Sequence, residues 1–188
     1  MSRIKVGVLV GSLRKDSFCR KLSKALKEVA PQSLELENVA IGELALYNED
    51  LDEPGNLPEA WTVFREKMKS CDAFLFVSPE YNRSVPGVLK NALDVGSRPP
   101  SKSVWGGKPG AVLTASPGSI GGFGANHHLR QTLSCLNVPT MQAPEAYLGN
   151  IATVFDENGN LTNERTRGFL QKFMESYVIW VDKNKLTQ

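Results

Sequence analysis

The sequence predicts an α/β fold in which helices cover both faces of a five-stranded parallel sheet. Short apolar segments rich in β-branched residues recur along the chain, and segments with apolar residues at helical spacing separate them. The length of 188 residues suits one domain and allows roughly 70% of the surface of the unfolded chain to be buried. We therefore expect residues 1–188 to form a single domain with strand order 2-1-3-4-5.

The first strand and helix are the clearest elements. Residues 4–10 are apolar and β-branched, which is typical of a strand buried on both faces. A helix should follow from about Ser17, with Asp16 or Ser17 as its cap, and should end before Pro31. Its inner stripe consists of Phe18, Leu22, Leu26 and Val29.

The middle of the chain should add two strands and two helices. We expect a strand over 34–41, then a long connection over 44–56 in which no clear period is visible. Pro58 in the first turn should begin a helix with Trp61, Phe64 and Met68 inside. A third strand is expected over 73–77, and a helix should begin near Pro86, where Ser84 can act as the cap.

The remaining segments complete a flavodoxin-like three-layer sandwich. A fourth strand is expected over 111–115, followed by a glycine-rich loop and a helix that carries Leu129 and Leu133. The fifth strand is short: we expect it over 138–141, with 146–148 as a further candidate segment. The last helix should bury Phe169, Phe173, Tyr177 and Trp180.

Composition limits the possible partners and compartments. The 22 basic and 20 acidic residues leave a net charge of only +2, with no basic block, so nucleic acid is not an expected partner. The three cysteines form no CxxC pair, which favours a reducing compartment. Because no signal peptide or membrane-length apolar run is visible, we expect a cytoplasmic protein with no membrane partner. Cys71 and Cys135 are expected in the core. Trp105 lies in a loop, and we expect it to border either the ligand site or a subunit contact.

The loop after the first strand is a candidate phosphate site. Free N–H groups at a helix N-terminus attract anions, and the hydroxyls of Ser12 and Ser17 and the guanidinium of Arg14 add donors. Lys15 adds charge. Neither a P-loop nor a G-x-G-x-x-G motif is present, which favours a terminal monophosphate over a dinucleotide. An ordinary capped turn with a solvated Arg-Lys pair is the alternative.

The loops after the third and fourth strands should face the same ligand. Pro79 stiffens the second loop, and Glu80, Tyr81 and Asn82 offer backbone N–H groups, an aromatic face and an amide for the edge of a flat heteroaromatic ring. The glycines after Ser116 let the backbone approach a ligand. The alternatives are a cap-and-turn motif with an exposed tyrosine and a flexible loop without a ligand.

Together these stretches resemble the bacterial NAD(P)H-dependent FMN reductase family, in the branch of quinone and chromate reductases. The resemblance runs from about Ile4 to Phe173. The matching motifs are Gly11-Ser12-Leu13-Arg14-Lys15 with Ser17-Phe18, Pro79-Glu80-Tyr81-Asn82 with Ser84-Val85-Pro86-Gly87, Leu89-Lys90-Asn91-Ala92 with Asp94, Gly121-Gly122, and His128-Leu129-Arg130-Gln131.

The resemblance implies non-covalent FMN and an NADPH or NADH co-substrate. Two electrons would pass through the flavin to a small-molecule acceptor: a quinone, an azo compound or a metal oxyanion such as chromate. The ring would lie between residues 79–82 and Ser116. The phosphate would be bound by Ser12, Arg14 and Ser17 with their neighbours Leu13, Lys15, Phe18 and Cys19.

The resemblance also implies a homodimer or homotetramer. We assign no metal ligand and no catalytic acid, base or nucleophile, because the cofactor performs the redox chemistry. Cys19 stands where the family usually has Asn, and it is either a thiol of lowered pKa or a small packing residue. Gly124 replaces an Arg that some members place in a tetramer interface. The adjacent His127 and His128 diverge on a helix, so we expect a surface or subunit contact rather than a shared metal.

Two other functions remain open at this point. A flavodoxin-type electron carrier would usually be strongly acidic for docking, and the charge of +2 argues against it. A non-enzymatic flavin-binding module is the second alternative. Bleaching of bound flavin by NADPH or NADH without a partner reductase separates the enzyme from both.

Overall fold

The predicted parallel sheet is present, with its five strands in the order β2-β1-β3-β4-β5. The computed structural model describes residues 3–185. The strands are β1 (Ile4–Val10), β2 (Leu34–Asn38), β3 (Ala73–Ser78), β4 (Gly110–Ala115) and β5 (Ala146–Leu148). β3 and β4 are buried along their whole length, as their uninterrupted apolar character requires. The flavodoxin-like strand order is therefore confirmed.

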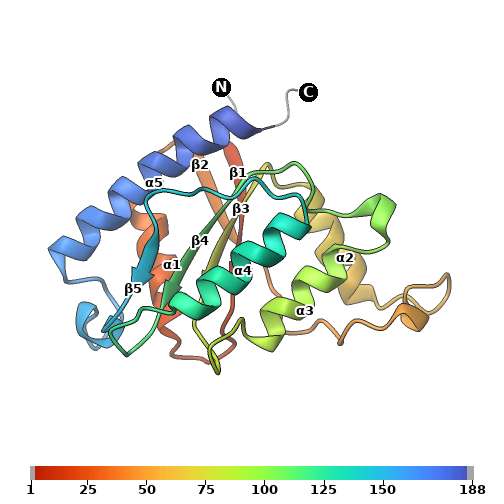
Figure 1. Ribbon diagram of the computed structural model, residues 1–188, viewed down its shortest axis with the longest axis horizontal. Helices are drawn as coiled ribbons and strands as arrows, with labels where there is room; N and C mark the ends of the chain where they lie inside the picture. The colour runs from red at the N-terminus through yellow and green to blue at the C-terminus, as the bar shows by residue number, and fades with distance from the viewer. Residues whose placement is uncertain (1–2, 186–188) are drawn as a thin grey trace.

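Two layers of helices enclose the sheet (Figure 1). One core cluster joins α1 (Phe18–Val29) and α5 (Glu164–Asn184) to one face of the sheet. A second cluster joins α2 (Glu59–Lys69), α3 (Gly87–Gly96) and α4 (Phe123–Cys135) to the other face. Both clusters pack against the same strands, so the site is built on a sheet that is covered on each side.

The element boundaries differ from the expectations at three places. β2 ends at Asn38 instead of continuing to 41, and the buried Val39 and Ile41 pack into the core on the α2 side. Pro58 is the residue that caps α2 rather than a residue of its first turn. The fifth strand lies at 146–148, while Thr140 forms only an isolated bridge with Gly110.

Two predictions about single side chains are wrong. Trp105 borders no surface: its ring is fully buried and its indole N–H donates to the Leu93 carbonyl at 2.9 Å. The ring lies directly over Gly96, where any side chain would collide with it. Cys135, the last residue of α4, is exposed, whereas Cys71 is buried as expected.

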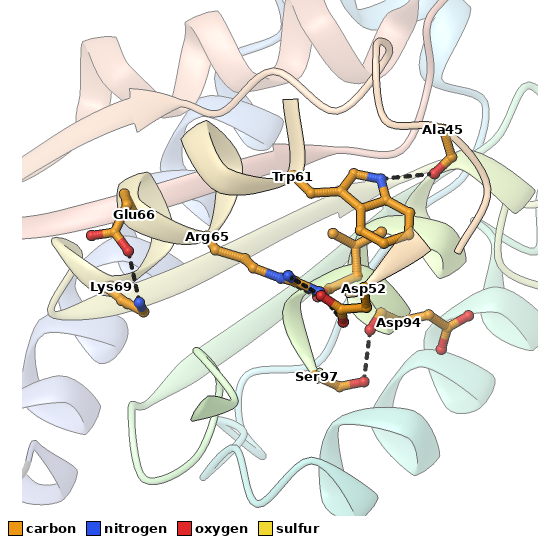
Figure 2. A network of polar contacts seen from close by, with 9 residues as sticks. Ala45, Asp52, Trp61, Arg65, Glu66, Lys69, Asp94 and Ser97 are labelled. Carbon is orange, nitrogen blue, oxygen red and sulfur yellow. Dashed lines mark hydrogen bonds and ion pairs between the residues drawn. The ribbon is translucent and has the colours of Figure 1, made fainter. Parts of the chain in front are cut away.

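A buried ion pair anchors the long connection between β2 and α2. The guanidinium of Arg65 donates two hydrogen bonds of 2.7 Å to the Asp52 carboxylate and one of 2.9 Å to the Val95 carbonyl. Figure 2 shows this fork beside the Trp61 ring, whose N–H donates to the Ala45 carbonyl. A segment without periodicity is thereby attached to two helices.

Candidate active site

Three loops meet at the carboxyl edge of the sheet, because parallel strands all end on the same side. They follow β1, β3 and β4 and cover residues 11–17, 79–86 and 116–122. A cavity of about 320 Å³ opens among them. This volume lies in the range of small-molecule sites. The edge that the sequence indicated therefore does carry a pocket.

Most of the predicted cofactor residues line this cavity. Three of them do not: the Leu13 side chain borders a neighbouring cavity, and Lys15 and Asn82 are exposed outside the lining. Ala115 and Pro117 also line the cavity but were absent from the predicted set, although they flank Ser116. The predicted residues that the structure brings together are Ser12, Arg14, Ser17, Phe18, Cys19, Pro79, Glu80, Tyr81 and Ser116.

The first loop presents a set of free donors. Ser17 caps α1, and its hydroxyl accepts the Cys19 N–H at 3.2 Å. The N–H groups of residues 12–16 donate no hydrogen bond to any other group within residues 3–185. The first turn of α1 contains no acidic residue. The Arg14 guanidinium stays beside this loop, donating to the Asp16 carbonyl at 3.0 Å and lying 5.7 Å from the centre of the Phe18 ring. Free N–H groups, a helix N-terminus and a guanidinium together favour an anion.

The first and second loops touch at Gly11. A methyl group at position 11 would lie 2.8 Å from the Ser78 hydroxyl and 3.3 Å from the Pro79 ring. Glycine permits this approach without displacing these neighbours. The loop after β1 and the wall formed by residues 79–81 are therefore held side by side.

The second loop is a tight turn. Tyr81 and Ser84 exchange backbone hydrogen bonds of 3.1 and 3.0 Å, and Asn82 and Arg83 between them have positive φ values of 50° and 65°. The Tyr81 side chain is half exposed. Ser84 does not cap α3 as expected: its hydroxyl lies 3.0 Å from Nδ1 of His128 on α4.

The third loop forms the opposite wall. Its backbone is held by a hydrogen bond of 3.0 Å from the Ser116 N–H to the Leu148 carbonyl. The Ser116 hydroxyl donates to the Gly118 carbonyl at 2.9 Å. This wall continues directly into α4 through Gly122.

Cys19 is a packing residue rather than a reactive thiol. Burial raises the pKa of its thiol to about 12, although the hydrogen bond with Ser17 acts in the opposite direction. A protonated thiol is a poor nucleophile. His127 and His128 are both exposed on α4. In the described part of the chain, no group of three or more His, Cys, Asp or Glu side chains is placed to hold a metal ion.

The fold and the cavity define a flavodoxin-like α/β protein with an anion-favouring pocket at the carboxyl edge of its sheet. The chain belongs to the NADPH-dependent FMN reductase family, whose model matches residues 4–153. This confirms both the predicted family and the predicted class of enzyme, the NAD(P)H-dependent FMN and quinone reductases.

Three comparisons illustrate the relationship. A quinone reductase of Pseudomonas putida is 57% identical over 180 residues, covering 96% of each chain. A 2-hydroxy-1,4-benzoquinone reductase of a Burkholderia species is 47% identical over 178 residues, covering 95% of this chain and 96% of the relative. The structure of FerB, a flavoenzyme NAD(P)H:(acceptor) oxidoreductase from Paracoccus denitrificans, has a TM-score of 0.91 and 41% identity and covers 97% of this chain and 100% of that one.

Proposed function

We propose that this protein binds FMN in the cavity among the three loops and uses NADPH or NADH to reduce quinones. The observation that carries the proposal is the placement of the predicted phosphate residues and the Pro79–Tyr81 wall around one cavity. The names of the relatives, which are quinone reductases, support the choice of acceptor. Azo compounds and metal oxyanions such as chromate stay predictions.

The residues present fit a flavin mononucleotide. The free N–H groups of residues 12–16, the Ser12 and Ser17 hydroxyls and Arg14 suit the phosphate, since each donates a hydrogen bond or carries positive charge. Pro79, Tyr81 and Pro117 offer apolar surface on the walls of the same cavity for a flat ring. When bound, FMN supplies the redox chemistry, while the chain supplies binding and electrostatics.

Among the described residues that line the cavity, we assign no catalytic acid, base or nucleophile. The Glu80 carboxylate is committed to Ala125 and Arg83, and the Cys19 thiol stays protonated. The residues of the cavity then bind the phosphate, hold the ring between two walls and leave space for a co-substrate.

Anaerobic titration tests the proposal. Protein loaded with FMN should lose its flavin absorbance when NADPH or NADH is added without a partner reductase, and benzoquinone should restore it. Bleaching that fails with both nucleotides would favour an electron carrier or a non-enzymatic flavin-binding module. If the protein takes up no FMN, the cavity assignment itself is wrong.

Several predictions stand beside this proposal. We expect one domain over residues 1–188, which the packing of both core clusters on one sheet supports. We expect a homodimer or homotetramer, which light scattering on the purified protein can measure. A cytoplasmic location also stays a prediction. Within residues 3–185 no helix has the length and apolar character needed to cross a membrane.

A further inference from the structure

The carboxylate of Glu80 lies at the junction between two walls of the cavity. Glu80 belongs to the loop after β3, and its side chain is only 10% exposed. One carboxylate oxygen accepts the N–H of Ala125 in the first turn of α4 at 3.0 Å. The other oxygen lies 3.2 Å from the guanidinium of Arg83, which is largely exposed.

Helix α4 cannot provide this contact from its own sequence. Its capping residue is Gly122, which has no side chain to accept a hydrogen bond, and its first turn contains no acidic residue. The N-terminus of a helix favours a negative charge, because the first N–H groups are free and the dipole is positive there. Glu80 supplies that charge from a loop 45 residues away in the sequence.

Gly124 makes the close approach possible. A methyl group at position 124 would lie 2.8 Å from the Arg83 carbonyl oxygen and 3.0 Å from the Glu80 carboxylate. The first turn of α4 is therefore in direct contact with the turn formed by residues 81–84. A second link between the same elements joins the Ser84 hydroxyl to His128, at 3.0 Å.

This junction connects the two walls that should enclose the ring. Tyr81 follows Glu80 on one wall, and Ser116 and Pro117 on the other wall lead through Gly122 into α4. We propose that Glu80 is a positioning residue that ties the loop over 79–84 to the N-terminus of α4 and so fixes the width of the flavin slot. The inference rests on the proposed function and assigns to Glu80 a role through its side chain that is distinct from binding the ring.

The test compares four variants with the wild-type protein. Glu80→Ala removes the link and should weaken FMN binding about tenfold or more, because a charge-assisted hydrogen bond is lost from a partly buried site. Glu80→Gln keeps an oxygen that can accept the Ala125 N–H and should restore most of the affinity. Gly124→Ala overfills the junction and should weaken binding as Glu80→Ala does. Arg83→Ala is the matched control, because it removes the exposed guanidinium and leaves the hydrogen bond between Glu80 and Ala125 in place.

Two readouts separate positioning from simple loss of stability. The visible circular dichroism of bound FMN should change in Glu80→Ala and Gly124→Ala but not in Arg83→Ala. Hydrogen exchange at the first turn of α4 should be faster in Glu80→Ala even without FMN. Wild-type affinity and dichroism in Glu80→Ala would overturn the proposal.

The exchange measurement also distinguishes a failure of the proposed FMN binding from a failure of the proposed link between Glu80 and α4. If the wild-type protein binds no FMN, the proposed function fails, but exchange still reports on the link itself. Unchanged exchange at Ala125 in Glu80→Ala would show that no such link exists.

Discussion

At the scale of single residues, Arg14 is the side chain on which the phosphate assignment depends most. It is exposed, its only hydrogen bond within the described residues is to the nearby Asp16 carbonyl, and it borders the cavity. Arg14→Ala should therefore weaken FMN binding about 10- to 100-fold, the cost of one or two charge-assisted contacts, while the free energy of unfolding of the apoprotein changes little. Fluorescence titration with FMN and urea unfolding measure the two effects.

Lys15→Ala is the natural control for that prediction. It removes the same charge from the next position, but Lys15 does not line the cavity. It should lower the affinity much less than Arg14→Ala. Equal losses in the two variants would show that general charge, not a specific guanidinium contact, attracts the phosphate.

The buried thiol of Cys19 should make the free energy of unfolding decrease at alkaline pH. A thiol in an unfolded chain has a pKa of about 8.5, and burial raises that of Cys19 to about 12 in the folded protein. The folded state therefore keeps a proton that the unfolded state releases. Its contribution to stability is complete below about pH 8.5 and is lost as the pH rises toward 12, at no more than about 1.4 kcal/mol per pH unit.

Urea unfolding at several pH values between 8 and 11 checks this behaviour. Cys19→Ala should show a shallower decline in the free energy of unfolding than the wild type. Burial also raises the pKa of Cys71, so part of the decline should remain. A wild-type slope in Cys19→Ala would contradict the assignment.

The sequence could predict that the candidate site residues are neighbours, but it could not predict the direction in which each side chain points. Chain order and the parallel sheet placed residues 12–19, 79–82 and 116 at one edge. Nothing in the sequence showed that Leu13 would turn toward Gly42, where its side chain lies 3.1 Å from the position of a methyl group, or that Asn82 would occupy a left-handed turn. Side-chain direction in a loop depends on the backbone torsion angles, which apolar periodicity does not encode.

At the scale of elements, the segment between β2 and α2 depends on the ion pair between Arg65 and Asp52. Both side chains are 9% exposed, so neither charge is well solvated. Asp52→Ala leaves the guanidinium buried without its partner and should lower the free energy of unfolding by about 3–5 kcal/mol. Urea unfolding provides the measurement.

An exposed pair offers the comparison. Lys90 and Asp94 form an ion pair one turn apart on α3, with both side chains about half exposed. Lys90→Ala should change the free energy of unfolding by no more than about 0.5 kcal/mol. A loss in Asp52→Ala as small as this one would mean that the connection is held by its apolar contacts alone.

The same region shows what the sequence could not predict. The helices and inner strands follow from periodicity, and Trp61, Phe64 and Met68 are buried as expected. The connection over 44–56 has no period, and its conformation is set by distant side chains. The Asn91 amide donates to the Leu44 and Ala45 carbonyls, and its oxygen accepts the Tyr47 N–H at 2.8 Å. Such contacts join positions more than 40 residues apart and leave no local signal.

At the scale of the whole molecule, cofactor binding should stabilise the fold. A ligand that binds only the folded state at 100 times its dissociation constant adds about 2.7 kcal/mol. For a chain of this length that corresponds to a rise of about 5–11 °C in the Tm. Thermal unfolding with and without saturating FMN measures this shift.

Riboflavin gives the control for the phosphate. It carries the same ring but lacks the anion that the first loop should bind, so at the same concentration it should raise the Tm much less than FMN. Equal increases in Tm would show that the phosphate contributes nothing to binding. If neither ligand raises the Tm, the cavity is not a flavin site.

The last helix has a consequence for synthesis. The hydroxyl of Tyr177 on α5 donates to the Phe74 carbonyl of the central strand β3 at 2.7 Å, and α5 shares with α1 the covering of one sheet face (Figure 1). Residues 164–184 leave the ribosome after every strand has already been made. Until they arrive, the apolar face that α1 and α5 share is only partly covered, so the nascent chain needs protection from aggregation until this helix has been made.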